Sequence, residues 1–209
     1  MINTKKELDF YIRADRIMNG FPAEPSLAQR LVNHLMVGGV IVKYLECFRK
    51  TSFYRRQFKS VVSFNGLKFI YFRKRCVALG RQLGISIAHD AEIGYGLVIP
   101  HYGCIVIGGA NVIGNYAVIF QDTTIAGNHN IIGDGLYLSA GAKIVKQVTL
   151  GNNVSISANS VVLLNCGDNI LLAGMPAKEV KQNYPCWYER DNLQHRVFEV
   201  EKLRIKMNL

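Results

Sequence analysis

The sequence predicts a parallel β-helix with helical segments before and after it, and three observations support this fold class. The first is an aliphatic residue that recurs at steps of about six, at positions 87, 93, 99, 107, 113, 119, 125, 132, 138, 144, 150, 156 and 162. The second is a glycine directly after several of these positions and a small or β-branched residue four places after them. The third is the lack of the i, i+3, i+4, i+7 apolar period of an amphipathic helix. Three six-residue units, each a short strand and a turn, close one triangular coil, and stacked coils bury a continuous aliphatic ladder.

The regular period is interrupted twice, and each interruption contains a histidine. The step from Ile99 to Ile107 has eight residues and contains His101, whereas the step from Ile125 to Ile132 has seven and contains His129. An insertion of this kind makes the backbone bulge from the coil and re-aims a side chain without disturbing the ladder. Because an imidazole titrates near neutral pH, it can accept a proton there. His34 and His195 are interpreted as structural, whereas His89, on a turn just before Ala91, is interpreted either as a surface turn residue or as part of a cleft.

Three parts of the chain are expected: a basic helical segment (1–82), the β-helix (83–182) and a helical tail (183–209). Residues 1–82 contain 16 Lys and Arg against 5 Asp and Glu, and they carry the excess behind the net charge of +10. Stretches such as FYRRQF and KFIYFRKR interleave aromatic and basic residues. This pattern is typical either of a segment that meets an anionic membrane or a lipid-linked glycan, or of a helical cap with a solvated basic face. Nucleic acid is not expected as a partner.

Local signals define the helices of the first and last parts. Thr4 and Glu7 have the spacing of a capping box, and the Gly and Pro of NGFP are expected to end the helix that follows. Two further helical segments are expected at about 26–50 and 53–82. The tail, 183–209, is expected to form a terminal helix that covers the last coil.

Composition indicates an ordinary globular protein of the cytoplasm. Apolar residues make up 49% of the chain and charged residues 19%. We expect no transmembrane helix, since no run of about 18 uncharged apolar residues occurs, and no signal peptide, since the first residues are charged. The five cysteines are scattered without C-x-x-C spacing, which favours a reducing compartment and gives no zinc signature. Peripheral attachment to the inner face of the membrane through the basic segment remains open.

Several motifs resemble a known family. The stretch IGDGLYLSAGAKIVKQVTLGNNVSISANSVVL followed by AGMPAK looks like the hexapeptide-repeat acyltransferases, and the whole of 83–182 looks like their serine acetyltransferase branch. KKELDFYIRADR and HYGCIVI are more similar to the serine-acetyltransferase-like proteins of capsule and exopolysaccharide gene clusters. The resemblance implies a left-handed β-helix, a homotrimer with clefts between neighbouring β-helices, and acetyl-CoA as co-substrate without a metal.

The resemblance also implies catalytic roles. His101 matches the general base of the family, which deprotonates the acceptor hydroxyl so that it attacks the thioester directly. His129 occupies the His position of the family's Arg-His-Pro-Lys motif, although Asn residues surround it here. Two departures matter: Ser86 and Pro100 stand where serine acetyltransferases have Asp residues that orient the imidazole and contact the amino acid substrate.

Further residues are expected to bind the acceptor or the co-substrate. Tyr102 follows the base, and its ring suits the C–H face of a sugar; Ser86, Gln121 and Asp122 complete the expected acceptor side. Asp122 or Asp90 is a candidate to orient His101 in place of the missing Asp. The positions that match the family's CoA-binding residues are Gly127, Ala140, Ala158, Gly174 and Lys178.

The expected function is acetyl-CoA-dependent O-acetyl transfer to a sugar hydroxyl of a surface polysaccharide or its precursor. Serine O-acetyl transfer for cysteine biosynthesis is the main alternative. A non-catalytic β-helical scaffold is a third possibility, but it leaves the insertion at His101 unexplained. A β-helical zinc enzyme would need three convergent His ligands, and the spacing of positions 89, 101 and 129 does not favour one.

Overall fold

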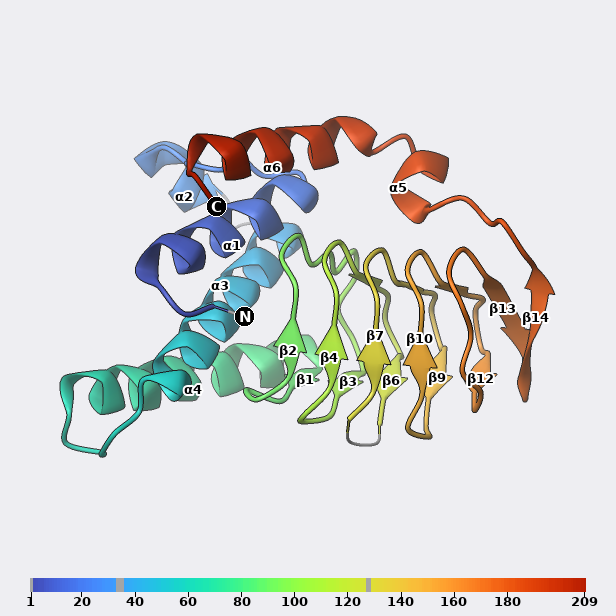
Figure 1. Cartoon of the computed structure of the whole chain (residues 1–209). Coiled ribbons are helices and arrows are strands. Elements are labelled where there is room, and N and C mark those ends of the chain that lie inside the picture. Colours follow the sequence, from blue (N-terminus) through green and yellow to red (C-terminus); the bar gives the residue numbers. More distant parts are fainter. Residues whose placement is uncertain (1, 33–35, 127–128) are drawn as a thin grey trace.

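The computed structural model describes residues 2–32, 36–126 and 129–209, in which a stack of short strands lies beside helices from both ends of the chain (Figure 1). His34 and Gly127 lie outside the described residues. The helices before the strands are α1 (Lys5–Met18), α2 (Leu27–Val32), α3 (Val37–Arg56) and α4 (Phe64–Leu83), and those after them are α5 (Trp187–Arg190) and α6 (Gln194–Lys206). The strands are β1 (Ile85–Ile87), β2 (Glu92–Ile93), β3 (Ile105–Ile107), β4 (Val112–Ile113), β5 (Val118–Ile119), β6 (Thr124–Ile125), β7 (Ile131–Ile132), β8 (Tyr137–Leu138), β9 (Lys143–Ile144), β10 (Thr149–Leu150), β11 (Ser155–Ile156), β12 (Val161–Val162), β13 (Leu171–Gly174) and β14 (Ala177–Lys181).

The strands of the described residues form the three faces of a triangular prism. Face A is the sheet β1-β3-β6-β9-β12, face B is β2-β4-β7-β10, and face C is β5-β8-β11-β13 with β14 added at its end. Neighbouring strands within each face are parallel except β13 and β14, which are antiparallel. The chain visits faces A, B and C in turn, so that its turns line up along three edges of the prism, which we call the A–B, B–C and C–A edges.

The predicted aliphatic ladder is confirmed. All thirteen repeat positions, from Ile87 to Val162, are buried, and the most exposed of them, Ile87, is only 9% exposed. Each inward side chain lies over its counterpart in the next coil, as in the register pairs of Ile93 with Ile113 and of Ile113 with Ile132. Burial of an aliphatic side chain contributes about 1.5–3 kcal/mol, so this ladder is the main source of stability of the β-helix.

Glycines at the B–C edge are required by close approach of neighbouring coils. A Cβ added to Gly114 would lie 2.3 Å from Oδ1 of Asp134 and 2.6 Å from its backbone nitrogen. That Oδ1 atom accepts a hydrogen bond from the backbone N–H of Asn115, at 2.7 Å. Gly114 does not have a positive φ, so lack of space rather than an unusual dihedral angle explains the glycine.

The N-terminal helices follow the local signals of the sequence at α1 and depart from the expected boundaries at two places. Over 26–50, where one helical segment is expected, the structure has two helices, α2 and α3, and α3 begins at Val37. Thr4 and Glu7 form the predicted capping box of α1, which ends at Met18 before Gly20. The expected break at 51–52 is wrong, because α3 continues to Arg56. The hydroxyl of Thr51 donates to the carbonyl oxygen of Cys47 one turn earlier, at 2.7 Å, and so satisfies its polar group inside the helix.

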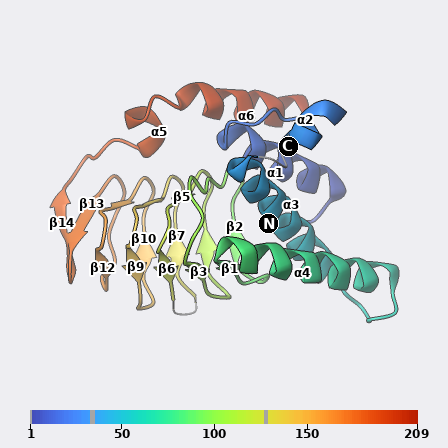
Figure 2. The same cartoon turned by 180° about the vertical axis from the view of Figure 1, so that it is seen from behind.

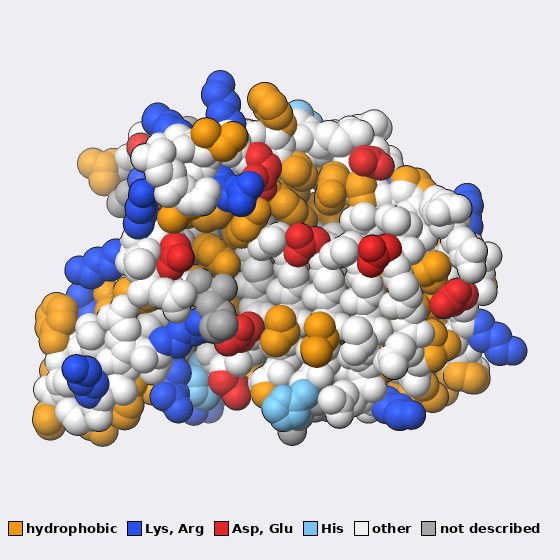
Figure 3. All heavy atoms as spheres, viewed as in Figure 1, with side chains coloured by type: hydrophobic (Ala, Val, Ile, Leu, Met, Phe, Trp, Pro, Cys, Tyr) orange, Lys and Arg blue, Asp and Glu red, His pale blue; other side chains and the backbone are white. Residues whose placement is uncertain are grey.

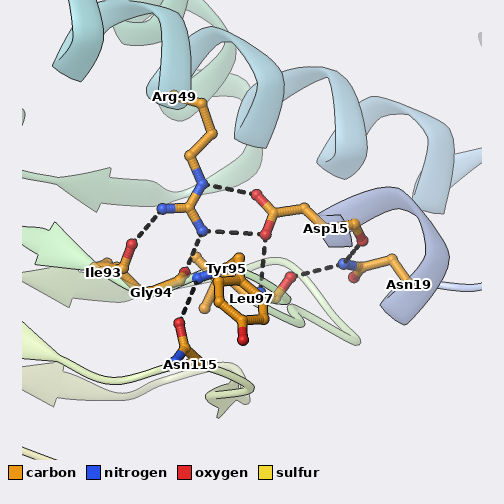
Figure 4. Close-up of polar contacts among 8 residues, drawn as sticks. All are labelled: Asp15, Asn19, Arg49, Ile93, Gly94, Tyr95, Leu97 and Asn115. Carbon is orange, nitrogen blue, oxygen red and sulfur yellow. Dashed lines mark hydrogen bonds and ion pairs between the residues drawn. The ribbon is translucent and has the colours of Figure 1, made fainter. Parts of the chain in front are cut away.

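A buried ion pair fixes α1 and α3 to the first coil (Figure 4). The Arg49 guanidinium of α3 contacts both carboxylate oxygens of Asp15 of α1, at 2.8 and 3.1 Å, and both side chains are about 1% exposed. Arg49 also donates to the carbonyl oxygens of Ile93 and Gly94, while Asp15 accepts from the backbone N–H of Leu97. The helical segment is therefore tied to the backbone of the coil that precedes His101.

The C-terminal tail returns to the start of the β-helix. β14 turns back along β13, and the chain then leads to α5 and α6, of which α6 lies beside α1 (Figures 1 and 2). The Tyr95 hydroxyl donates to the Glu201 carboxylate of α6 at 2.9 Å, and Trp187 of α5 donates to the carbonyl oxygen of Tyr116 at 2.8 Å. The expectation that the tail helix covers the last coil is therefore wrong, because its apolar side, including buried Val200, packs on α1 and the first coils instead.

In the described part of the chain, none of the helices combines the length and the apolar character that crossing a bilayer requires.

Candidate functional site

The eight-residue step produces a widened corner at the C–A edge. Val98 pairs with Val118 before this corner, and Val106 pairs with Thr124 after it. The eight-residue step on the first coil therefore lies opposite a six-residue step on the second. The inserted residues leave the ladder intact, since the core positions on both sides of the corner stay buried.

His101 and Tyr102 are the two inserted residues. The backbone N–H of Asp122 donates to the carbonyl oxygen of Gly103 at 2.8 Å, which restores contact between the coils directly after the insertion. Both inserted side chains are exposed, Tyr102 to 51%. The predicted bulge is thus present, and it presents an imidazole and a phenol together at one corner of the prism.

No carboxylate of the described residues holds the imidazole of His101. Its ring lies 6.5 Å from the ring of Phe120, centroid to centroid, at an angle of 43°. Among the described residues no hydrogen bond or ion pair to the His101 side chain is present. Asp90 lies at the A–B edge, next to Gly109, and therefore does not orient His101 within one chain.

Asp122 lies at the same edge, one coil further on, but its carboxylate has another partner. Lys143 of β9 places its Nζ atom 3.5 Å from Oδ1 of Asp122 and donates to the Asp122 carbonyl oxygen at 3.1 Å. Sequence reasoning named Asp122 and missed Lys143. The six-residue repeat holds a signal for it, because Lys143 is the outward residue of face A in the coil after Asp122.

Gln121 adds an unsatisfied polar atom to this corner. Its side-chain carbonyl oxygen is buried, and no donor among the described residues reaches it. Buried polar atoms in folded proteins are nearly always hydrogen-bonded, whereas this acceptor, one coil from His101, has no donor in the described part of the chain.

Small residues continue along the C–A edge from this corner to the end of the prism. The N–H of Gly141 donates to the carbonyl oxygen of Gln121, and the N–H of Asn159 donates to that of Ala140, so that Ala140 and Ala158 occupy the same edge in successive coils. The edge reaches the β13–β14 turn, where the N–H of Gly174 donates to the Ser160 hydroxyl at 3.1 Å.

Ala158 and Gly174 are exposed and Ala140 is half-buried, so backbone is accessible along much of the edge. Lys178 is exposed on β14, where it pairs with Ala173. An edge of this kind lets a thin ligand approach the backbone closely.

The remaining candidates lie on face A or across it. Ser86 points outward from β1 and is in register with Val106 of β3, so it lies on face A rather than at the corner. His129 is exposed at the A–B edge, with a φ of +67° in the seven-residue step. Face A therefore separates His129 from His101 within one chain, and the structure does not bring these two histidines together there.

Two buried asparagines at the A–B edge were not singled out by sequence reasoning. Asn111 and Asn130 are fully buried, and the Asn130 amide nitrogen donates to Oδ1 of Asn111 at 2.9 Å. Oδ1 of Asn130 accepts from the N–H of Val148 at 2.8 Å. The signal was present, since each asparagine stands directly before a two-residue strand. Their hydrogen bonds hold the corner from which His129 projects.

His89 lies in the turn between β1 and β2, where its side chain packs against α4. Its ring lies 5.8 Å from that of Phe69 of α4, and its carbonyl oxygen accepts from the Ser52 hydroxyl. Burial lowers the pKa of His89, and the neighbouring Arg73 lowers it further. Within the described residues no group of three or more His, Cys, Asp or Glu is placed to hold a metal ion.

The known proteins to which the sequence is similar include serine acetyltransferases. The chain is 33% identical over 144 residues to the serine acetyltransferase of Haemophilus influenzae, covering 62% of this chain and 54% of that protein. It is 37% identical over 107 residues to the serine acetyltransferase of Staphylococcus aureus, covering 48% and 50%. The chain thus spans about half the length of the curated relatives it matches. No family model matches the sequence.

Solved structures that this chain resembles in fold are also serine acetyltransferases. A serine acetyltransferase in complex with CoA matches with a TM-score of 0.62 and 25% identity over 81% of this chain and 68% of that chain. The serine acetyltransferase of Brucella abortus strain S19 matches with a TM-score of 0.64 and 22% identity over 86% of this chain and 71% of that chain. The left-handed parallel β-helix with N-terminal and C-terminal helices is confirmed by these matches. The chain therefore shares the hexapeptide-repeat fold of the serine acetyltransferases and is similar to them in sequence over about half their length.

Proposed function

We propose that the protein is an acetyl-CoA-dependent O-acetyltransferase with His101 as general base. The observation that carries the proposal is the widened corner, where an exposed imidazole without a hydrogen-bond or ion-pair partner in the described residues stands at one end of an edge of small residues. His101 removes the proton of an acceptor hydroxyl as its oxygen attacks the acetyl carbonyl carbon. The C–S bond breaks, and the imidazolium returns the proton to the departing thiolate. A positioned base of this kind contributes about 10²–10⁴ in rate.

The C–A edge is the proposed binding place of acetyl-CoA. Ala140, Ala158 and Gly174 leave room for a pantetheine arm beside the backbone, and Lys178 at its far end offers a cation for phosphate groups. The open carbonyl oxygen of Gln121 lies between this edge and His101 and is available to an N–H or O–H donor of a ligand. Gly127 stays a candidate from the resemblance alone. The observed edge fits a long, thin co-substrate.

L-Serine is the first acceptor to consider, because the relatives and structural neighbours are serine acetyltransferases, one of them solved in complex with serine. With serine as acceptor, the products are O-acetylserine and CoA, and the reaction serves cysteine biosynthesis. The ammonium and carboxylate of serine need charged or strongly polar partners once they leave water. Asp122 is the acidic candidate near the base, although its carboxylate already pairs with Lys143.

A sugar hydroxyl of a surface polysaccharide or its precursor is the second candidate acceptor. Three observations favour it: Pro100 directly precedes the base, Ser86 rather than an acid lies outward on β1, and Tyr102 offers a half-exposed ring beside the base. An aromatic face suits the C–H surface of a pyranose, and a neutral acceptor needs no carboxylate partner.

A homotrimer is the proposed assembly, and His129 is the proposed second active-site residue. His101 and His129 lie on opposite edges of face A in one chain. A closed ring of parallel prisms can bring the C–A edge of one chain beside the A–B edge of the next, which gives three equivalent clefts. His129 would then bind the acceptor or stabilise charge from the neighbouring chain.

The cytoplasm is the proposed compartment, with attachment of the basic helices to the inner face of the membrane. None of the five cysteines is in a disulfide, which fits a reducing environment.

A thiol-release assay with acetyl-CoA decides between the acceptors. L-Serine and a panel of sugars and nucleotide sugars are compared with the wild-type protein and with Tyr102→Ala. Serine acceptance predicts rapid CoA release with serine alone at a sub-millimolar Michaelis constant, and little effect of Tyr102→Ala on that constant. Sugar acceptance predicts release with a sugar and a raised Michaelis constant in Tyr102→Ala. Tyr71→Ala, equally exposed on α4 at 55%, is the matched control. Hydrolysis without any acceptor in the panel, at the same rate in all variants, contradicts the proposed transfer.

A further inference from the structure

The loop between α3 and α4 and the first turns of α4 carry a cluster of exposed apolar side chains. We call residues 57–71 the hairpin tip. Its exposed apolar residues and their exposed fractions are Val61 (57%), Val62 (84%), Phe64 (71%), Leu67 (58%) and Tyr71 (55%). Single exposed apolar residues are common on soluble proteins, but a contiguous group of this size marks an interaction surface.

Acidic residues are absent from the sequence around the hairpin tip. Between Glu46 and Asp90 the chain has ten Lys and Arg and no Asp or Glu. Ion pairs with carboxylates involve Arg49, Lys50 and Arg56 of these ten. In the part of the chain that the structure describes, the other seven have no carboxylate within ion-pair distance; they are Arg55, Lys59, Lys68, Arg73, Lys74, Arg75 and Arg81. The hairpin tip is therefore an apolar surface inside a strongly positive field.

Apolar and basic residues are ordered along α4. Phe64, Leu67 and Tyr71 follow one another at helical spacings of three and four on one side, and Lys74 and Arg75 continue that side towards the β-helix. At about 1.5 Å per residue, the cations lie about 15 Å along the axis from Phe64. The hairpin projects away from the prism in both views, and hydrophobic and basic side chains mix on its end, without acidic ones on the visible face (Figures 1, 2 and 3).

We infer that the hairpin tip is a membrane-docking element that inserts its apolar residues among anionic lipids. The combination of an apolar insertion and surrounding Lys and Arg is what interfacial binding to an anionic bilayer requires, since apolar burial and attraction to lipid headgroups add. Within the helix, Nζ of Lys68 lies 4.1 Å from the Phe64 ring centroid, so a cation accompanies the ring to the headgroup level.

Charge selects a bilayer over a second copy of the same hairpin. Two copies would bring two strongly basic segments together without acidic residues between Glu46 and Asp90 to pair with them, which disfavours self-association at ordinary ionic strength. An anionic bilayer complements both features at once. The inference rests on the proposed cytoplasmic location but not on the acetyl transfer, which a separate assay measures. It also places the first coil, which begins with β1 directly after α4 and carries His101, at the membrane end of the molecule.

Vesicle co-sedimentation of the full chain tests this inference. Phosphatidylcholine vesicles are compared with vesicles that contain phosphatidylglycerol, at low and high salt. The wild-type protein is expected to bind the anionic vesicles and to be released by salt. Phe64→Ser or Val62→Ser is expected to weaken binding about tenfold, the loss for exposing one large apolar side chain. Lys59→Gln and Lys74→Gln are each expected to weaken it about fivefold.

Two matched controls lie on α6, far from the hairpin tip in sequence. Phe198→Ser removes an apolar side chain with the same 71% exposure as Phe64, and Lys202→Gln removes an exposed cation. Both are expected to bind as wild type. The inference is overturned if the wild type fails to bind anionic vesicles, or if Phe64→Ser binds as well as Phe198→Ser. It is equally overturned if light scattering shows that Phe64→Ser lowers the oligomeric mass of the free protein, because the tip is then a contact between copies. CoA release by Phe64→Ser in solution stays at the wild-type rate, so failure here is separable from failure of the proposed activity.

Discussion

At the scale of single residues, interactions between polar groups of different helices and coils are the hardest to predict from the sequence. Asp15 and Arg49 are separated by 34 positions and belong to different helices, yet they form the buried ion pair that holds the helical cap to the first coil. Neither residue has a distinctive sequence neighbourhood. Their role depends on tertiary packing, which brings both of them to the carbonyl groups of the coil before His101.

Arg49→Met is predicted to destabilise the protein by about 3–5 kcal/mol, because it leaves the Asp15 carboxylate buried without a partner. Denaturant unfolding measures the change. Arg13→Met is the matched control, since Arg13 pairs with Asp9 at a partly exposed site and is expected to contribute at most about 1 kcal/mol. Equal stability of the two variants would show that the buried pair does not hold the cap.

The residues of the candidate site differ in how far the sequence predicts them. His101 follows from the eight-residue step, because an insertion in a regular coil must leave the ladder and be exposed. Lys143 and the Asn111–Asn130 pair were not predicted, although all three occupy regular places in the repeat. Their roles depend on which residues lie beside them in the adjacent coil. The six-residue period identifies those neighbours only when it is known which residues form each edge of the prism.

At the scale of secondary-structure elements, the period predicts the strands well and the ends of the chain less well. The ladder positions were all predicted, because burial at a fixed period is a property of the sequence itself. The boundary between α3 and α4 was predicted at 51–52 but lies at 57–63, after Thr51 has satisfied its hydroxyl within α3. The position of α6 depends on contacts with α1 and with Tyr95, residues that are more than 100 positions away.

Ile113→Asp is predicted to unfold the β-helix or to destabilise it severely. Ile113 is 2% exposed and stacks between Ile93 and Ile132, so the substitution buries an unpaired carboxylate at a cost of several kcal/mol, against a total stability of about 5–15 kcal/mol for a typical domain. Val112→Asp changes the adjacent residue, which points outward and is 44% exposed, and a change within about 0.5 kcal/mol is expected. Thermal melts followed by circular dichroism compare the two. A cooperative, wild-type melt of Ile113→Asp would contradict the stacking register.

At the scale of the whole molecule, the prism arranges its chemistry along edges. The C–A edge joins His101, the open Gln121 carbonyl oxygen and the small residues that lead to β13–β14, while the A–B edge carries His129. The N-terminal helices and α6 lie at the end of the stack opposite the β13–β14 hairpin, and α5 lies between these two ends (Figure 1). The six-residue period of the sequence predicts a prism. Which edges of neighbouring prisms would meet in an assembly depends on the surfaces of the folded chain.

Acetyl transfer at the widened corner is tested most directly by the turnover rate of His101→Ala. The side chain is exposed and lies outside the ladder, so the variant is expected to keep the melting behaviour and the oligomeric mass of the wild type. With acetyl-CoA and the acceptor that the panel identifies, its rate of CoA release is predicted to fall by about 10² or more, with little change in the Michaelis constant for acetyl-CoA. A folded His101→Ala protein that turns over at the wild-type rate would contradict the assignment of the base and of the corner as the reaction site.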